Sequence, residues 1–316
     1  MEGTTPSCNV ANGDAPSCNA NECSCTDHQP LVSVLMAAYN PGKYLIEAVR
    51  SILSQTYQNW ELVVLDDAST DDTWKNLQSF AAKDSRVRIF QNDHNLGFSG
   101  TRNRLFTLMD SKAEFIAVLD SDDVALPTRL QMQVTFLQKH PEIGAVGSSI
   151  IIIDENSSVT SFRRYPSTPE AVRSTAMKSN PMAHSTLMIR RSVQLVLGDY
   201  GTRLSCCEDY DYLLRMLEVT SYTNLEAPQV AYRISSTQWT KRRIRHSLLV
   251  SQAVQRRYLF RRGYFSLSAL LSHCARYLLA LVPQRLVLWL FFRLTYRPCP
   301  AEYARLVATV EPESVK

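Results

Sequence analysis

Two aspartates separated by one residue, Asp120 and Asp122, follow directly after the apolar segment FIAVL of residues 115–119. Two carboxylates at this spacing can face one divalent cation and a ribose together. Mg²⁺ and Mn²⁺ prefer oxygen ligands and complete their shells with water and phosphate oxygens. Such a cation offsets the negative charge that develops on a diphosphate leaving group. The alternative interpretation is an Asx turn that caps the helix expected from Pro127 onward.

Two further segments carry groups that suit a nucleotide. Asp66 and Asp67 end the apolar run ELVVL; one of them can cap the next helix, and the other can accept a hydrogen bond from the imide N–H of a uracil or a similar base edge. The segment NLGFSGTRN, residues 95–103, allows close backbone approach at its glycines, and its Arg102 offers a fixed cation to a phosphate or base. The alternative is a loop with an ordinary solvated arginine. The segment is not the GxGxxG dinucleotide fingerprint, which disfavours a nicotinamide enzyme.

Three more residues could take part in chemistry. Glu208 and Asp209 begin a predicted helix, where a carboxylate has a structural role opposite the helix dipole but can equally act as a general base toward an acceptor hydroxyl. His184, in the segment MAHST, could reach a diphosphate or a metal, and a buried structural histidine is the alternative. The sequence leaves both pairs of alternatives open.

The elements that must position these residues alternate between strands and helices. Strands are expected at residues 31–38, 61–65, 87–90, 115–119, 144–153, 186–189 and 230–234, and helices at 45–53, 73–82, 100–109, from 127 and at 208–217. This alternation predicts an α/β fold with a mostly parallel, Rossmann-like sheet flanked by helices. Ligands of such sheets collect at the carboxyl ends of the strands. Tyr39-Asn40, Asp66-Asp67 and the segment DSDD of residues 120–123 follow three such ends, so we expect them at one edge.

Composition divides the chain of 316 residues into three parts. We expect a flexible tail at residues 1–29, a catalytic domain at 30–239 and a helical, basic segment at 240–316. The tail holds Cys8, Cys18, Cys23 and Cys25, whose spacing matches no standard zinc pattern, although a small metal site with His28 is the alternative. No apolar signal segment precedes them, so we expect reduced thiols and a cytoplasmic protein.

Six segments together resemble glycosyltransferase family 2, whose members adopt the GT-A fold. VSVLMAAYN is similar to the family's opening strand, ELVVLDDASTDDT to its VDDGSTDGT-type motif, and NLGFSGTRN to NxGxxxARN. VLDSDD resembles the DxD loop, and AHSTLMIRRS and EDYDYLLRM resemble the later HSS and EDYDLWLR patterns. The six segments occur in the family's order from about residue 31 to residue 239, which makes the match far more specific than any one motif.

The resemblance implies an inverting transferase that acts on a nucleotide-diphosphate sugar, usually UDP-linked. Its nucleotide-sugar residues correspond to Ala38, Tyr39, Asn40, Asp66 or Asp67, Arg102, Asp120 and Ser121. Asp122, with His184, would hold Mg²⁺ or Mn²⁺. Asp209 would be the general base, and Glu208 would position the base or the acceptor. The acceptor would be a glycan or a lipid-linked saccharide of cell-surface polysaccharide synthesis.

This sequence departs from the family pattern at two places. The closing segment YRIS, residues 232–235, has Ser235 where the family often has a histidine, so contacts made by that histidine are in doubt. The QxxRW motif of processive polymer synthases is missing, which predicts transfer of one sugar at a time. A sugar-nucleotidyltransferase is the alternative enzyme, but it would normally have repeated glycines after the first strand. A non-catalytic membrane-docking scaffold is the third possibility.

The C-terminal segment is apolar and strongly basic. Between Ala227 and Ala301 there are 13 Lys and Arg and no Asp or Glu. No uncharged run approaches the ~20 residues that span a bilayer. A basic amphipathic segment on an anionic membrane surface is therefore expected, with a helical subdomain packed on the catalytic core as the alternative. Nucleic acid is not an expected partner, because no base-reading motif accompanies the charge.

Overall fold

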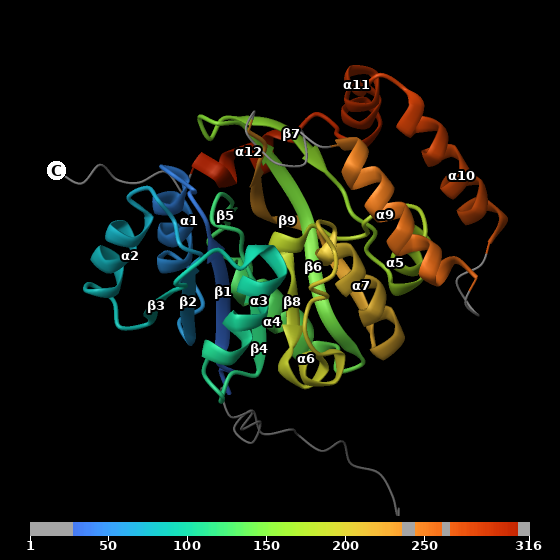
Figure 1. Ribbon diagram of the computed structural model, residues 1–316. Helices are drawn as coiled ribbons and strands as arrows, with labels where there is room; N and C mark the ends of the chain where they lie inside the picture. Colours follow the sequence, from blue (N-terminus) through green and yellow to red (C-terminus); the bar gives the residue numbers. More distant parts are fainter. Residues whose placement is uncertain (1–27, 236–243, 261–265, 309–316) are drawn as a thin grey trace, which may run out of the picture.

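The computed structural model describes residues 28–235, 244–260 and 266–308 (Figure 1). The four tail cysteines lie outside the described residues, as do most of the basic cluster of residues 241–245 and the pair Arg261-Arg262. The tail's His28 is described, and its ring contacts the Glu114 carboxylate at 2.7 Å.

Nine strands of the described residues form one sheet. Their bounds are β1 Val32–Ala38, β2 Trp60–Asp66, β3 Val87–Gln91, β4 Phe115–Val118, β5 Val124–Ala125, β6 Ile143–Ile153, β7 Val159–Arg163, β8 Met188–Arg190 and β9 Ser221–Arg233. The strand order is β3-β2-β1-β4-β8-β6-β9-β5, and β7 pairs with β6. The β1–β2, β1–β4, β2–β3 and β6–β9 pairs are parallel, and the pairs that involve β5, β7 and β8 are antiparallel.

Helices cover both faces of this sheet (Figure 1). Their bounds are α1 Tyr44–Leu53, α2 Thr73–Ala81, α3 Gly97–Leu108, α4 Arg129–Lys139, α5 Pro169–Ala176, α6 Arg191–Leu197, α7 Glu208–Val219, α9 Ile244–Leu259, α10 Leu267–Leu281, α11 Gln284–Thr295 and α12 Ala301–Ala308, with a short 3₁₀ turn η1 at His184–Thr186. Among the described residues, no helix combines the length and the apolar character that crossing a membrane requires.

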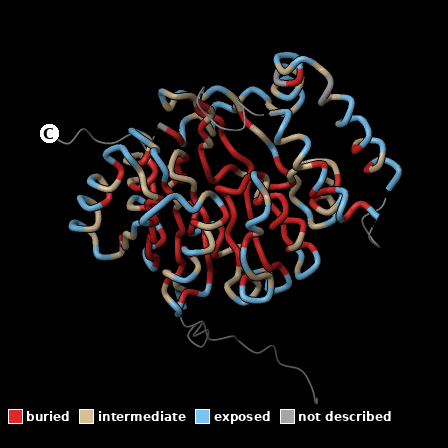
Figure 2. Tube along the Cα trace, viewed as in Figure 1, coloured by how far each residue is buried: buried red, intermediate tan, exposed pale blue. Residues whose placement is uncertain are grey.

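The sheet separates two large apolar cores, and the central strands are buried along most of their length (Figure 2). Alternate residues of one strand point to opposite faces. Val34 and Met36 of β1 accordingly join the core under α1 and α4, whereas Leu35 joins the core under α3 and α7. Because both faces are covered, the central strands are apolar throughout, which explains the continuous apolar runs in the sequence.

The predicted parallel core of the sheet is confirmed, and with it the common edge at its carboxyl ends. β1, β2 and β4 run in the same direction, and the Asp67 amide donates to the Ala38 carbonyl at 2.8 Å. The loops that follow these three strands therefore lie side by side.

Several elements differ from the expectations. The last strand was expected from Val230 but begins at Ser221; its polar first half pairs with β6 through a register shift near Ser148. The helix expected from Gly100 begins at Gly97, and the one expected from Pro127 begins at Arg129. β5, β7, α5 and α6 were not anticipated, because these short elements have too little periodicity to be recognised.

Gly147 of β6 shows how closely β9 packs against it. A Cβ at this position would lie 2.5 Å from Asn224 Oδ1 and 2.6 Å from Met182 Cγ. The Asn224 amide is itself fixed by bonds to the Pro166 and Pro181 carbonyls, so it cannot move away freely. We expect Gly147→Ala to lower the free energy of unfolding by about 1–3 kcal/mol, as overpacking does, measured by urea denaturation.

Gly201→Ala is the matched control for this measurement. A Cβ there would meet Asp211 Oδ2 at 3.6 Å, an ordinary contact, so the change should stay within about 0.5 kcal/mol. Equal stabilities of the two variants would contradict the packing explanation for Gly147.

Candidate functional site

The loops after β1 and β2 are tied to each other. The Asn40 amide donates to Ser69 Oγ at 3.0 Å, and the Thr70 amide donates to Asn40 Oδ1 at 2.8 Å. Asn40 and Ala68 both have positive φ, at 48° and 60°. Residues other than glycine rarely adopt this conformation, and such residues cluster at ligand sites. The hydrogen bonds between the loops maintain it here.

Asp66 and Asp67 have different environments. Asp66 has no exposed surface, and its carboxylate accepts from the Ser69 amide and from Gln91, both at 3.0 Å. Asp67 Oδ1 accepts from Asn92 Nδ2 at 2.7 Å and from the Leu96 amide at 2.8 Å, and Asp67 Oδ2 accepts from the Gly97 amide at 3.0 Å. Asp66 therefore caps its own loop, and Asp67 holds the start of α3. A nucleotide contact of Asp67 stays a prediction.

Tyr39 lies at the same edge, with 53% of its surface exposed. Its ring is open to a ligand, whereas Ala38 beside it is buried and bonded to Asp67 through its carbonyl. The predicted roles of Ala38, Tyr39 and Asn40 toward a nucleotide sugar stay predictions.

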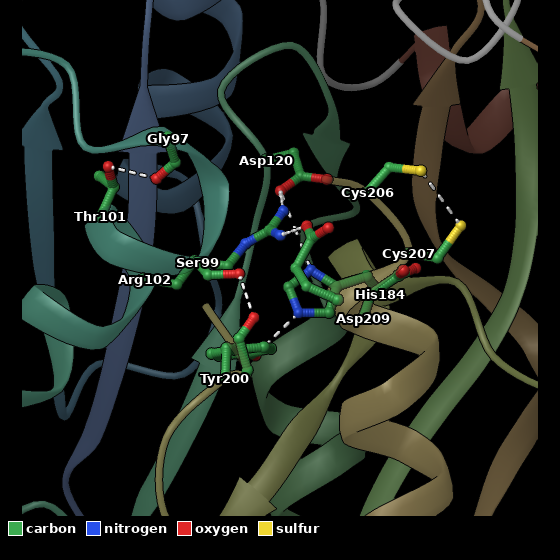
Figure 3. A network of polar contacts seen from close by, with 12 residues as sticks. Gly97, Ser99, Thr101, Arg102, Asp120, His184, Tyr200, Cys206, Cys207 and Asp209 are labelled. Carbon is green, nitrogen blue, oxygen red and sulfur yellow. Dashed lines mark hydrogen bonds and ion pairs between the residues drawn. The ribbon is translucent and has the colours of Figure 1, made fainter. Parts of the chain in front are cut away.

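Arg102 joins two acidic groups from distant parts of the chain (Figure 3). Projecting from α3, it donates through Nη2 to Asp120 Oδ1 at 3.1 Å and through Nη1 to Glu208 Oε1. The side chains of Arg102 and Glu208 are only 11% and 8% exposed, whereas that of Asp120 is 31% exposed. The structure thus brings together three of the predicted site residues, from the NLGFSGTRN segment, the DxD loop and the start of α7.

The opposite charges of Arg102, Asp120 and Glu208, the Arg102 triad, keep these groups ionised. Burial alone would lower the pKa of Arg102, but Asp120 and Glu208 outweigh it and raise that pKa. Burial alone would likewise raise the pKa of Asp120, and Arg102 holds it below its ordinary value. The charged forms are therefore maintained in a largely desolvated place.

Asp209 lies beside this triad at the start of α7. It is partly exposed, and its Oδ2 accepts from Asn180 Nδ2 at 2.9 Å. Burial and the negative charge of Glu208 raise the pKa of Asp209 to about 6, although Arg102 opposes the shift. A carboxylate with a raised pKa is a stronger base and remains ionised near neutral pH. The geometry therefore suits a general base.

His184, in the turn η1, is buried next to Asp120. Its Nε2 is 2.8 Å from the Tyr200 hydroxyl, and its Nδ1 is 4.0 Å from Asp120 Oδ1. Nδ1 is buried and has no hydrogen-bond partner in the part of the chain that the structure describes. Burial and the nearby Arg102 lower the pKa of His184 to about 3, so the ring is neutral at physiological pH. A neutral imidazole with an unused nitrogen is the form that binds metal ions.

A metal ion at this site would need ligands from a substrate as well as from the protein. Among the described residues, no group of three His, Cys, Asp or Glu side chains is placed to hold an ion by itself. Asp122 is partly exposed, as is Ser121 beside it. Asp122 and His184 are the predicted protein ligands of a magnesium or manganese ion, which would take its other oxygens from a diphosphate and water. The unused Nδ1 of His184 supports this assignment, which stays a prediction.

Two fully buried arginines bond the backbone of the acidic loop and of the strand before it. Neither was expected from the sequence to be a site residue. Arg129 Nη2 donates to the Val118 carbonyl at 2.7 Å, and Arg233 Nε donates to the Asp122 carbonyl at 2.8 Å. Arg233 also bonds Glu47 at 2.7 Å, and its amide donates to Asp123 Oδ1 at 2.8 Å. The loop that carries the predicted metal ligand is therefore held at both ends.

The sequence analysis also missed Asn180 and Tyr200. Neither lies in a recognisable motif, and each contacts the site through a residue far along the chain. The sequence signal for Arg233 is its place in the YRIS segment, next to the position of Ser235 where the family often has a histidine.

Comparison with known proteins agrees with this geometry. The model of the family described as "Glycosyl transferase family 2" matches residues 33–195, half of the chain. EpsE of Bacillus subtilis is 36% identical over 236 residues, which are 72% of this chain and 83% of that protein. The UDP-Glc:alpha-D-GlcNAc-diphosphoundecaprenol beta-1,3-glucosyltransferase WfaP of Escherichia coli is 31% identical over 258 residues, 78% of this chain and 97% of WfaP.

Among solved structures, the mannosyltransferase PcManGT of Pyrobaculum calidifontis, in complex with GDP-Man and Mn²⁺, is similar in fold. Its TM-score is 0.57 at 18% identity, with 90% of this chain and 86% of that chain covered. The sheet flanked by helices is thus the GT-A fold predicted from the sequence. With the family's motifs converging on one acidic edge of this fold, the protein belongs to glycosyltransferase family 2.

Proposed function

We propose that this protein transfers one sugar, with inversion, from a UDP-sugar to a hydroxyl of a lipid-linked acceptor in cell-surface polysaccharide synthesis. The observation that carries the proposal is the convergence of Arg102, Asp120 and Glu208 beside Asp209. WfaP, which covers most of this chain, supports a UDP-linked donor and a diphosphate-linked lipid acceptor.

The residues divide the reaction between them. Asp209 takes the proton of the acceptor hydroxyl, whose oxygen then attacks the sugar C1 from the face opposite the diphosphate. Arg102 supplies positive charge close to the departing diphosphate, and Glu208 holds Arg102 in place. Asp122 and His184 would hold Mg²⁺ or Mn²⁺, which would offset the negative charge that develops on the diphosphate. Tyr39 and Asp67 border the nucleotide in this arrangement.

A UDP-release assay with a panel of sugar nucleotides tests the proposal. Turnover should require Mg²⁺ or Mn²⁺, should need a GlcNAc-diphospholipid or a similar acceptor, and should be lost in Asp122→Asn. Formation of a UDP-sugar from UTP and a sugar 1-phosphate would instead identify a sugar-nucleotidyltransferase. Membrane binding without turnover on any donor would identify a scaffold.

The pKa of Asp209 predicts how activity depends on pH. Because the base must be ionised, kcat/KM should fall about tenfold per pH unit below pH 6. A pH–rate profile of UDP release checks this, and a flat profile between pH 5 and about 7 would contradict it.

The raised pKa of Asp209 also makes folding stability depend on pH. The pKa of Asp209 is about 6 in the folded state and has its ordinary value of 3.8 in the unfolded chain, so the free energy of unfolding decreases as pH rises between these values.

The exposed side chains of the C-terminal helices support binding of the protein to the cytoplasmic face of an anionic membrane. Exposed apolar side chains on α10 and α11 include Leu271 at 62%, Leu278 at 67% and Leu294 at 81%. Arg285 and Arg293 lie on α11 beside them and are exposed. Co-sedimentation with phosphatidylglycerol vesicles, but not with phosphatidylcholine vesicles, is the expected result, and Leu278→Glu/Leu294→Glu should weaken it.

A further inference from the structure

Arg163, the last residue of β7, lies between aromatic rings from two parts of the molecule. Its guanidinium carbon is 4.4 Å from the centroid of the Tyr165 ring and 5.8 Å from that of Phe291 on α11. A hydrogen bond to Tyr296 adds a third aromatic neighbour. Within residues 28–235, 244–260 and 266–308, no carboxylate lies within ion-pair distance of Arg163. Its neighbour Arg164, by contrast, pairs with Glu226 at 2.7 Å.

Through the Tyr165 ring, Arg163 is connected to the part of the molecule that holds the candidate base. Tyr165 is buried, and burial raises its pKa to about 12, with a smaller contribution from the negative charge of Asp209. Hydrogen bonds also connect the two places, since Asn224 Nδ2 donates to the Pro166 carbonyl at 2.8 Å and to the Pro181 carbonyl at 3.1 Å. Pro166 follows Tyr165, and Pro181 follows Asn180, whose amide group bonds Asp209. The ring that supports the Arg163 guanidinium is thus tied to the segment that contacts the candidate base.

Through the Phe291 ring, Arg163 also contacts α11, which, like α10, carries exposed apolar side chains. Phe291 is 40% exposed, and Trp289 and Leu294 on the same helix are 54% and 81% exposed. The backbones meet there as well, since Phe162 of β7 and Arg297 exchange two hydrogen bonds, at 2.8 and 2.9 Å. Arg163 therefore contacts both a ring tied to the segment at the candidate base and a helix with exposed apolar side chains, which suit a lipid chain.

Resting on the proposed function, we propose that Arg163 binds a phosphate of the lipid-linked acceptor, whose hydrocarbon chain lies along α10 and α11. The planar guanidinium forms two parallel hydrogen bonds to phosphate oxygens, which a lysine cannot imitate. Stacking on Tyr165 restricts the guanidinium before the ligand arrives, so less entropy is lost on binding. This arrangement places the phosphate between the hydroxyl at Asp209 and the lipid at the surface.

Binding of farnesyl diphosphate by the full chain tests this assignment. Calorimetric titrations are made in EDTA with saturating UDP, so that the donor's diphosphate site does not contribute. Arg163→Gln should raise the Kd about tenfold, as loss of a charge-assisted contact does. Arg164→Gln removes an equal charge from the adjacent residue and should change the Kd less than about twofold. Farnesol, which has no phosphate, should bind all three proteins equally.

Three results would overturn the assignment. Equal weakening by the two variants would show a general charge effect, and an equal loss of farnesol binding by Arg163→Gln would show a structural clamp between β7 and α11. If Arg163→Gln no longer bound phosphatidylglycerol vesicles but still bound farnesyl diphosphate as tightly as the wild type, Arg163 would be a contact for membrane headgroups instead. If the wild type releases UDP from no donor in the presence of the lipid-linked acceptor, the proposed function fails, while the farnesyl diphosphate comparison still decides the role of Arg163.

Discussion

Asp209→Asn is expected to lower kcat by about a hundred- to ten-thousand-fold, the usual contribution of a general base. The amide keeps the size of the carboxylate and can still bond Asn180, but it cannot take a proton. Because the change affects proton removal and not donor binding, the KM for the sugar nucleotide should stay nearly constant. Rates of UDP release at saturating donor and acceptor measure the effect.

Asp211→Asn is the control on the same helix. Asp211 is buried and pairs with Arg215 at 3.1 Å and Arg257 at 3.5 Å, away from the Arg102 triad. Its neutralisation should reduce stability while leaving kcat near the wild-type value. If Asp209→Asn retained more than about a tenth of the wild-type kcat, well above the range of a lost base, another group would be the base.

Arg102→Met is expected to affect both activity and folding. It leaves the carboxylates of Asp120 and Glu208 without their shared cation. Breaking a buried pair by removing one partner costs about 3–5 kcal/mol of folding stability. Loss of a preorganised charge at the leaving group lowers kcat/KM by about a hundred- to a thousand-fold. Urea denaturation and UDP release measure the two effects.

The double variant Arg102→Met/Glu208→Gln separates the two effects. Neutralising Glu208 removes one uncompensated charge, so the double variant should recover part of the stability lost in Arg102→Met. Its activity should remain low, because the positive charge at the diphosphate is still missing. Recovery of activity together with stability would mean that Arg102 acts only by holding the fold.

A second consequence of Arg102→Met concerns Asp209. Arg102 lowers the pKa of Asp209 against the larger effects of burial and Glu208. Removing the guanidinium should therefore raise that pKa and move the acid limb of the pH–rate profile to higher pH. Residual activity of the variant suffices to locate this limb.

Much of the catalytic domain could be predicted because its signals are local. The apolar runs at β1, β2 and β4 identify buried parallel strands, and Asp66, Asp67 and Asp120 follow them directly. Parallel strands end at one edge, so the convergence of these acids follows from strand direction alone. β9 was predicted too short because the apolar pattern is interrupted between Asn224 and Gln229. Its pairing with β6 outweighs the local preference there.

The sequence by itself determined the α/β order, the edge at which the acids collect, and the family to which the six motifs point. Only the tertiary structure decided that Arg102 pairs with both Asp120 and Glu208, that Asp66 is buried while Asp209 stays partly open, and that Arg233 supports the acidic loop. The physical reason is that pKa shifts and ion pairs depend on burial and on distances between groups. Glu208 is 106 residues from Arg102 along the chain, and no local pattern encodes that distance.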